Sequence, residues 1–201
     1  MRPVDGTHIQ IMNRFQRFTL LLICLVCLPG LSAWAQTPVP DAVSMVRPVA
    51  AAPQIGAKSY LLVDFNSERI LVEHNADMRV EPASITKLMT AYAVFSELSQ
   101  GNIALDETVT ISENAWRTGG SRMFIEPGME ISVEDLIRGM VIQSGNDASV
   151  ALAEYVAGSE EAFASLMNHY AELLGMTSTN FRNSTGLPDP DHYTTTKLFV
   201  M

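Results

Sequence analysis

The sequence predicts one α/β (α+β) domain that follows an N-terminal leader. Its 201 residues are 47% hydrophobic and 17% charged, which is typical of a globular chain rather than a disordered one. Short apolar runs near residues 59–73 predict paired strands, and helical periodicity recurs in several later segments. A chain of this length has room for one ordinary domain in addition to a leader.

The N-terminus has the features of an export signal. Arg14 and Arg17 provide a basic start, residues 18–31 are mainly apolar, and Ala33-Trp34-Ala35 forms a small-x-small cleavage site. We therefore expect residues 1–35 to be a signal peptide. An uncleaved anchor is the alternative, although the apolar run is short for a membrane span.

A linker is predicted between the leader and the domain. Four prolines interrupt residues 36–57, which are rich in alanine and lack an amphipathic period. The pattern of a folded domain begins at residue 58, so we assign residues 58–201 to it. Both cysteines, Cys24 and Cys27, lie inside the leader, and no disulfide is expected in the domain.

The domain is expected to begin with a hairpin. Residues 59–64 and 69–73 are predicted strands, and Phe65-Asn-Ser-Glu68 is the turn between them. A further short strand is expected at residues 109–111.

Helices are predicted where apolar residues recur at helical spacing. The first covers about 84–99, and Gly101 follows its end. Its apolar face is expected to lie in the core and consists of Ile85, Leu88, Met89, Tyr92, Phe95 and Leu98. Ser132-Val-Glu-Asp135 resembles a capping box and predicts the start of the next helix. The later helices are expected at about 133–142, 147–158 and 160–174.

The most informative motif is Ser84-Ile-Thr-Lys87 at the start of the first helix. The two outer residues lie on the same helix face, so the Lys87 amine is able to take the proton from the Ser84 hydroxyl. Free N–H groups and the positive end of the helix dipole meet the reacting group there. Taken alone, the pattern also fits a capping serine beside a solvated lysine.

A second motif, Ser144-Gly-Asn146, adds a hydroxyl and a side-chain amide, which suit proton relay and substrate orientation. Taken alone, it also fits a turn in which glycine allows positive φ and asparagine caps the next helix. The two motifs in this order favour a serine acyl-transfer site. Its catalytic residues are Ser84, Lys87 and Ser144, and Asn146 binds substrate. Burial and the helix N-terminus must lower the pKa of Lys87 if its amine is to act as a base.

Other chemistries have less support in the sequence. The net charge of −9 argues against nucleic acid as the main partner, because phosphate binding needs a basic face. His74 and His169 share no metal-ligand spacing with an acidic cluster, so neither a metal nor a cofactor is expected. His192 is expected to be a structural or surface group rather than a base, since Lys87 already supplies a base.

Several longer stretches extend the two motifs. They are Pro82-Ala-Ser-Ile-Thr-Lys-Leu-Met-Thr90, Ser112-Glu-Asn-Ala-Trp116, Thr118-Gly-Gly-Ser-Arg-Met-Phe124, Ser132-Val-Glu-Asp-Leu136, residues 138–148, Phe181-Arg-Asn-Ser-Thr-Gly-Leu-Pro188 and His192-Tyr-Thr194. In these stretches, from about residue 57 to 195, the chain resembles the serine D-alanyl-D-alanine carboxypeptidases, the low-molecular-mass penicillin-binding proteins 5 and 6.

This resemblance implies a penicillin-recognising, serine transpeptidase/β-lactamase-like domain, in which helices flank an antiparallel sheet. It implies that Ser84 forms the acyl-enzyme and that Lys87 is its general base. Ser144 would pass a proton to the leaving amine, and Asn146 would hydrogen-bond the substrate peptide. The implied substrate is a peptidoglycan stem peptide that ends in D-Ala-D-Ala, and β-lactam antibiotics would acylate the same serine.

The sequence departs from the family at one motif. A Lys-Thr-Gly strand follows Ser-Gly-Asn in the family, whereas Lys197 is followed here by Leu198-Phe199. We therefore expect a partial catalytic domain, truncated before this strand and before the family's C-terminal amphipathic anchor. That anchor implies a full-length form in the periplasm, held at the outer face of the inner membrane.

Two alternatives stay open. A class A β-lactamase-like hydrolase is expected to carry Ser-Asp-Asn and a later glutamate for deacylation, whereas position 145 is glycine. A fragment without activity is the other alternative, because the Lys-Thr-Gly motif is missing. Turnover of a D-Ala-D-Ala peptide separates these possibilities.

Overall fold

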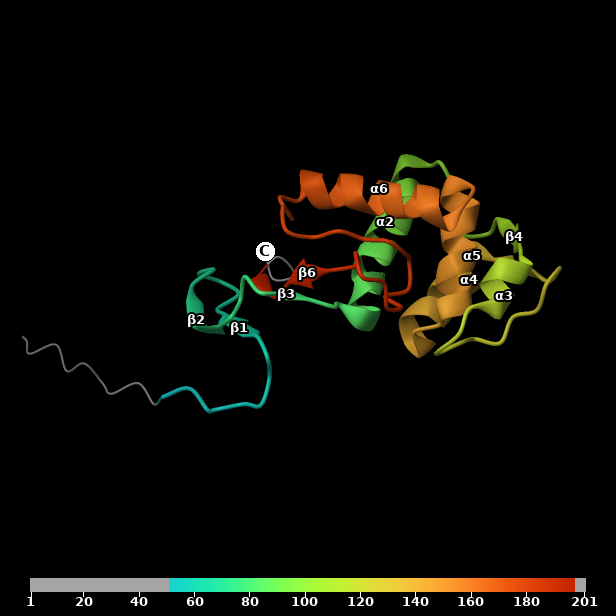
Figure 1. Ribbon diagram of the computed structural model, residues 1–201. Helices are drawn as coiled ribbons and strands as arrows, with labels where there is room; N and C mark the ends of the chain where they lie inside the picture. Colours follow the sequence, from blue (N-terminus) through green and yellow to red (C-terminus); the bar gives the residue numbers. More distant parts are fainter. Residues whose placement is uncertain (1–50, 198–201) are drawn as a thin grey trace, which may run out of the picture. The chain divides into compact units, whose positions relative to one another are not determined.

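The structure is a computed structural model that describes residues 51–197, and its helices and strands are labelled in Figure 1. The predicted signal peptide, most of the predicted linker and residues 198–201 lie outside the described residues.

The predicted hairpin is confirmed. Strands β1 (Tyr60–Val63) and β2 (Ile70–His74) are antiparallel, and Tyr60 pairs with His74. The turn between the strands is stabilised by Asp64, whose Oδ1 accepts hydrogen bonds from the Ser67 N–H (2.8 Å) and hydroxyl (2.6 Å). An aspartate that bonds a backbone N–H a few residues later is a common way to close a turn.

Two further pairs of short strands connect distant parts of the chain. Strand β3 (Arg79–Val80) pairs with β6 (Thr194–Thr195), and β4 (Thr108–Thr110) pairs with β5 (Glu130–Ser132), both antiparallel. The described residues therefore contain three separate two-stranded antiparallel sheets. The β3–β6 pair lies just before the Ser84 motif, so it ties the start of the first helix to a segment more than a hundred residues later.

The predicted first helix is divided into two parts. A 3₁₀ turn, η1 (Ala83–Ile85), leads into α2 (Thr86–Gln100). Pro82 precedes the turn, and proline favours the start of a helix because its fixed φ suits the first turn. Gly101 ends α2 in the left-handed conformation (φ +74°), as a glycine after a helix commonly does.

The remaining helices follow the sequence prediction closely. The short α3 (Glu113–Arg117) precedes α4 (Val133–Gln143), α5 (Asn146–Ala157) and α6 (Glu160–Leu173). The hydroxyl of Ser132 caps α4 by accepting from the Asp135 N–H at 3.1 Å, which confirms the predicted start of that helix.

Helix α5 lies at the centre of the core and contacts α2, α3, α4 and α6 (Figure 1). The first eight residues of α5 are buried, because the neighbouring helices cover this part of the helix. The largest fully buried side chains of the core are Phe163, Phe181, Leu136, Met140, Leu152 and Met167. Burying a side chain of this size stabilises a fold by about 1.5–3 kcal/mol.

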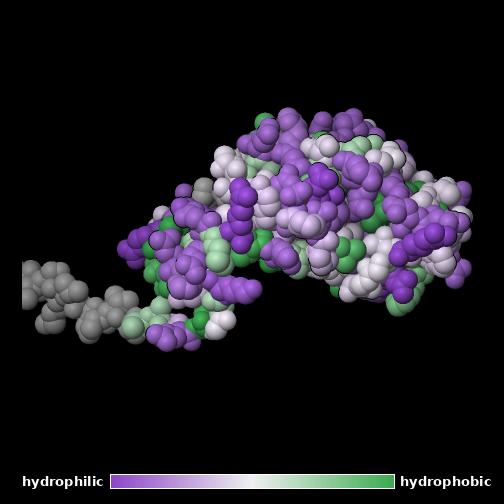
Figure 2. All heavy atoms as spheres, in the orientation of Figure 1, coloured by the Kyte–Doolittle hydropathy of each residue, from purple (hydrophilic) through white to green (hydrophobic). Residues whose placement is uncertain are grey.

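The predicted core face of α2 is wrong for most of its residues. Met89 is buried, but the exposed fractions of Ile85, Leu88, Tyr92 and Phe95 are 54%, 64%, 45% and 49%. Figure 2 shows one face of the molecule, on which hydrophobic residues lie between hydrophilic ones.

Small and polar residues form the buried face of α2 instead. Thr86 and Thr90 are fully buried, and Ala93 and Val94 lie beside them in the core. The hydroxyl of Thr90 donates to the Ser184 carbonyl oxygen at 2.7 Å, which satisfies this polar group inside the protein. Helical periodicity predicts that a helix forms, but these long-range partners decide which of its faces is buried.

Candidate active site

Ser84 lies in a tight turn immediately before α2. The preceding residue, Ala83, has a left-handed backbone (φ +47°), which is uncommon for a residue with a side chain. Strained residues of this kind are found at functional sites, where the surrounding structure holds them. The Ser84 side chain is exposed, so a substrate is able to reach its hydroxyl.

Lys87 has the opposite environment. It is the second residue of α2, its exposed fraction is 7%, and its Nζ donates to Asn146 Oδ1 (2.6 Å) and to the Thr185 carbonyl oxygen (2.8 Å). Both acceptors are neutral. Burial lowers the pKa of Lys87 from 10.5 to about 8, because desolvation disfavours the ammonium. An amine with this pKa is neutral in roughly a tenth of the molecules at pH 7, and the neutral form is the one that accepts a proton.

Asn146 is held on both sides of its amide group. Its Oδ1 accepts from Lys87, while its Nδ2 donates to the Gly119 carbonyl oxygen at 2.7 Å. Its backbone N–H donates to the Ser121 carbonyl oxygen, also at 2.7 Å. The orientation of the Asn146 amide is therefore determined by its place at the start of α5 and by the loop around residue 120.

Ser144 ends α4 in a left-handed conformation (φ +56°) and is half-buried. Only Gly145 separates it from α5, so its side chain lies at the junction of two helices. Of the four sequence-predicted residues, the structure brings Lys87 and Asn146 into direct contact. Within residues 51–197, no hydrogen bond joins the hydroxyl of Ser84 or Ser144 to Lys87.

The loop at residues 181–187 belongs to a stretch that resembles the family, but its contact with Lys87 was not predicted from the sequence. The Oδ1 of Asn183 accepts from the backbone N–H groups of Thr185 (3.2 Å) and Gly186 (2.7 Å), which shapes the loop so that the Thr185 carbonyl faces Lys87. The only local signal was the turn-forming run Asn183-Ser-Thr-Gly186. It indicates a turn, but a backbone acceptor leaves no side-chain pattern.

Gly186 explains why this loop approaches the Ser84 turn so closely. Its φ is +84°, and a Cβ at this position would lie 1.8 Å from the Ala83 carbonyl oxygen. No larger residue fits there without displacing one of the two backbones. The loop therefore packs directly against the turn that carries Ser84.

His192 packs against the first turn of α2. It is buried, its Nδ1 accepts from the Arg182 N–H at 3.0 Å, and its Nε2 lies 2.8 Å from the Thr86 hydroxyl. Because Nδ1 is an acceptor, the neutral ring carries its proton on Nε2, facing Thr86. Burial lowers the pKa of His192, which favours this neutral form. These contacts agree with the expected structural role.

Comparison with known proteins assigns the family. A sequence profile of the D-alanyl-D-alanine carboxypeptidases, peptidase S11, matches residues 46–200. The chain belongs to this carboxypeptidase family. The match covers both motifs and the loop at residues 181–187, so the contacts of Lys87 lie within the family domain.

Individual relatives agree with the family assignment. The chain is 46% identical over 152 residues to the D-alanyl-D-alanine carboxypeptidase DacC of Escherichia coli, covering 73% of this chain and 38% of the relative. It is 44% identical over 137 residues to the carboxypeptidase DacF of Bacillus subtilis, covering 68% of this chain and 35% of the relative. The chain thus spans less than half the length of these two curated relatives.

Solved structures of the carboxypeptidase family share the fold. Penicillin-binding protein 5 from Haemophilus influenzae aligns with a TM-score of 0.72 at 43% identity, covering 75% of this chain and 45% of that one. The carboxypeptidase DacD from Francisella tularensis aligns with a TM-score of 0.71 at 44% identity, covering 74% and 36%. The predicted penicillin-recognising fold class is therefore confirmed for the part of the chain that the structure describes.

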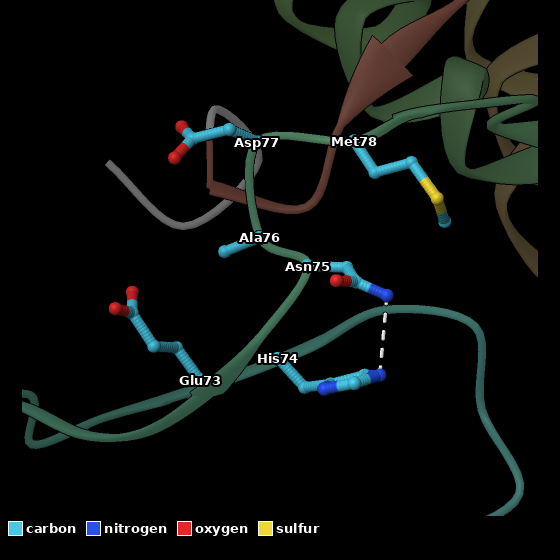
Figure 3. Close-up of a pocket in the computed structure, with 6 residues that line it drawn as sticks. All are labelled: Glu73, His74, Asn75, Ala76, Asp77 and Met78. Carbon is cyan, nitrogen blue, oxygen red and sulfur yellow. Dashed lines mark hydrogen bonds between the residues drawn. The ribbon is translucent and has the colours of Figure 1, made fainter.

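A pocket elsewhere in this carboxypeptidase-family domain does not include Ser84, Lys87, Ser144 or Asn146. It is lined by the last two residues of β2 and by residues 75–78, which precede β3. Figure 3 shows the Asn75 amide donating toward His74 within it. Within residues 51–197, no three His, Cys, Asp or Glu side chains are grouped as a metal site would require. None of the helices in this range has the length and apolar character needed to cross a bilayer.

Proposed function

We propose that this domain carries the acyl-transfer residues of a serine D-Ala-D-Ala carboxypeptidase. Ser84 is the nucleophile, Lys87 the general base, Ser144 a proton relay and Asn146 a substrate-binding residue. The substrate is a peptidoglycan stem peptide ending in D-Ala-D-Ala, and penicillins acylate the same serine. No cofactor takes part.

One observation carries the proposal, namely the environment of Lys87. The amine is buried, contacts only neutral acceptors, and has a pKa lowered to about 8, one turn after an exposed serine. A lysine that served only solubility or a salt bridge gains nothing from such burial. A general base works best when its pKa is near the operating pH.

The reaction follows from the roles of these residues. The neutral Lys87 amine takes the Ser84 proton while Oγ attacks the carbonyl carbon of the penultimate D-alanine, and the N–H of Ser84 stabilises the resulting oxyanion. The C–N bond then breaks, and Ser144 passes a proton from Lys87 to the leaving amine of the terminal D-alanine. Water finally attacks the Ser84 ester, Lys87 accepts a proton from that water and returns it to Ser84 Oγ as the ester bond breaks, and the shortened peptide is released.

The substrate also suggests where the protein acts. Peptidoglycan stem peptides lie in the cell envelope, and residues 1–35 have the pattern of an export signal. We place the mature protein in the periplasm. We further propose that the full-length form associates with the outer face of the inner membrane through an amphipathic helix.

Covalent labelling tests the assignment of the nucleophile. We expect a fluorescent penicillin to attach to Ser84, as located by mass spectrometry of the labelled peptide, and Ser84→Ala to abolish the labelling. Ser99→Ala is the matched control, because Ser99 is an exposed serine in α2, the helix that follows the Ser84 turn. Labelling that persists in Ser84→Ala, or that maps to another serine, refutes the proposal.

A further inference from the structure

Asp147 is a buried carboxylate that the proposed reaction does not use. It is fully buried, and its Oδ1 accepts from the backbone N–H groups of Met123 (3.0 Å) and Ala148 (2.9 Å). Its Oδ2 accepts from the N–H groups of Phe124 (2.9 Å) and Ile125 (3.4 Å). A buried charge is stable only when its hydrogen-bonding capacity is filled, and here backbone donors fill it.

Three of these donors belong to one irregular loop. Residues 119–125 lie in the connection between α3 and β5 and form neither helix nor strand, and Gly120 and Phe124 in this loop have positive φ values of +85° and +63°. The N–H groups of such a loop have no partners in a helix or sheet, so they need side chains or water. Asp147 supplies acceptors for three consecutive N–H groups, at positions 123 to 125, and thereby anchors the loop to α5.

The opposite end of the same loop holds Asn146. The Gly119 carbonyl accepts from Asn146 Nδ2 and the Ser121 carbonyl accepts from the Asn146 N–H, both at 2.7 Å. Because Gly119 engages the amide nitrogen, the amide oxygen is directed toward Lys87, 2.6 Å away. A Cβ on Gly120 would lie 2.6 Å from this same amide nitrogen, so the loop fits closely around Asn146.

Gly145 leaves the space that this arrangement needs. A Cβ at this position would lie 3.1 Å from Asp147 Oδ1, 3.1 Å from the Gly139 carbonyl oxygen and 3.4 Å from the Met123 nitrogen. A side chain there would crowd the carboxylate at the point where it meets the loop. The glycine between Ser144 and Asn146 therefore serves the anchoring of the loop by Asp147.

We propose that Asp147 is a positioning residue of the acyl-transfer site. Its carboxylate fixes the loop at residues 119–125, and the Gly119 carbonyl of that loop orients the Asn146 amide with its oxygen toward Lys87. The inference rests on the proposed function, because Lys87 and Asn146 have catalytic and binding roles only within it. Asp147 itself does not contact the reacting atoms.

The variant Asp147→Asn tests this inference with almost no change in shape. Each carboxylate oxygen accepts from two N–H groups, so either orientation of the new amide places its NH₂ group against two donors. We expect amide hydrogen exchange at Met123 or Phe124 to accelerate at least about tenfold, as the loss of about one hydrogen bond implies. The NMR signals of the Asn146 side-chain amide should shift or broaden as the Gly119 contact loosens.

The acylation rate of the Asp147→Asn variant provides a second test. Penicillin acylation of Ser84 should fall about tenfold, since the disturbed Asn146 no longer supports Lys87 and the substrate. Asp106→Asn is the control, because Asp106 is exposed and the same charge is removed. A folded Asp147→Asn protein with the parent's loop exchange, Asn146 signals or acylation rate overturns the inference.

A measurement on the unmodified protein covers the case in which Asp147→Asn does not fold. The amides of Met123 and Phe124 are expected to exchange at least about tenfold more slowly than that of the exposed Gly119. Equal exchange overturns the inference. Failure of the parent protein to react with penicillin instead refutes the proposed function, while the exchange and NMR data still decide whether Asp147 anchors the loop.

Discussion

The Nζ of Lys87 lies 2.6 Å from Oδ1 of Asn146, although the two residues are 59 positions apart in the chain. One belongs to the second position of α2 and the other to the first position of α5. Because two helix N-termini meet at this contact, their dipoles and burial both disfavour a positive charge on the amine. This environment favours the neutral form of the Lys87 amine.

The rate of penicillin acylation is expected to increase with pH and to level off above about 8. The neutral amine is the reactive form, and the lowered pKa of Lys87 is about 8, so the neutral fraction rises through that value. The second-order rate constant should be measured between pH 6 and pH 10 with a fluorescent penicillin. A rate constant that does not change across this range contradicts the assignment of Lys87 as the base.

The variant Lys87→Arg should reduce acylation by at least about 10²-fold, the typical contribution of a general base. Arginine retains the positive charge, but its guanidinium does not release a proton near neutral pH. Lys197→Arg is a suitable control, since Lys197 is a half-exposed lysine paired with Asp77 at 3.4 Å. An acylation rate within about threefold of the parent would mean that another group acts as the base.

The variant Gly186→Ala should destabilise the fold by roughly 3 kcal/mol or more, from backbone strain and steric overlap together. The overlap arises because its Cβ would lie 1.8 Å from the Ala83 carbonyl oxygen. Gly101→Ala is the matched control: its φ is also positive (+74°), but nothing lies within 4 Å of its Cβ. We expect the control to lose only the strain component, about 1–2 kcal/mol. Urea unfolding measures both, and equal losses would contradict the close packing of the loop against the Ser84 turn.

Cleavage of the leader is expected after Ala35. N-terminal sequencing of protein recovered from the periplasm should therefore begin at Gln36, because Ala33 and Ala35 satisfy the small-x-small rule. A product that begins at Met1 or Met12 and stays with the membrane would support the alternative of an uncleaved anchor.

Local features of the fold could be predicted from the sequence. Helical periodicity located α4 and α6 to within about a residue, and Ser132 was identified as a cap, because such signals depend on neighbours a few positions away. The buried face of α2 could not be predicted in the same way. Thr86 and Thr90 are buried because His192 and Ser184 supply partners about a hundred residues later, and no local pattern reveals those partners.

The same distinction applies to the site. Ser84, Lys87, Ser144 and Asn146 were identified as candidates for roles that stay predictions, since side chains at a recognisable spacing leave a trace in the sequence. Thr185 was not, because it contributes a backbone carbonyl rather than a side chain. Asp147 was not assigned a role either, since its partners are backbone N–H groups of a loop more than twenty residues earlier.

The pairing of β3 with β6 has a consequence for how the molecule folds. Arg79 pairs with Thr195, Thr86 contacts His192 and Lys87 contacts Thr185. The surroundings of Ser84 are therefore built from contacts of very high sequence separation. Closing such long loops costs entropy before the contacts are made, which slows folding. During synthesis Ser84 is made early, but the residues that surround it are complete only after residue 195 has been translated. Lys87 therefore reaches its acceptor at Thr185 only after α2 to α6 have been translated.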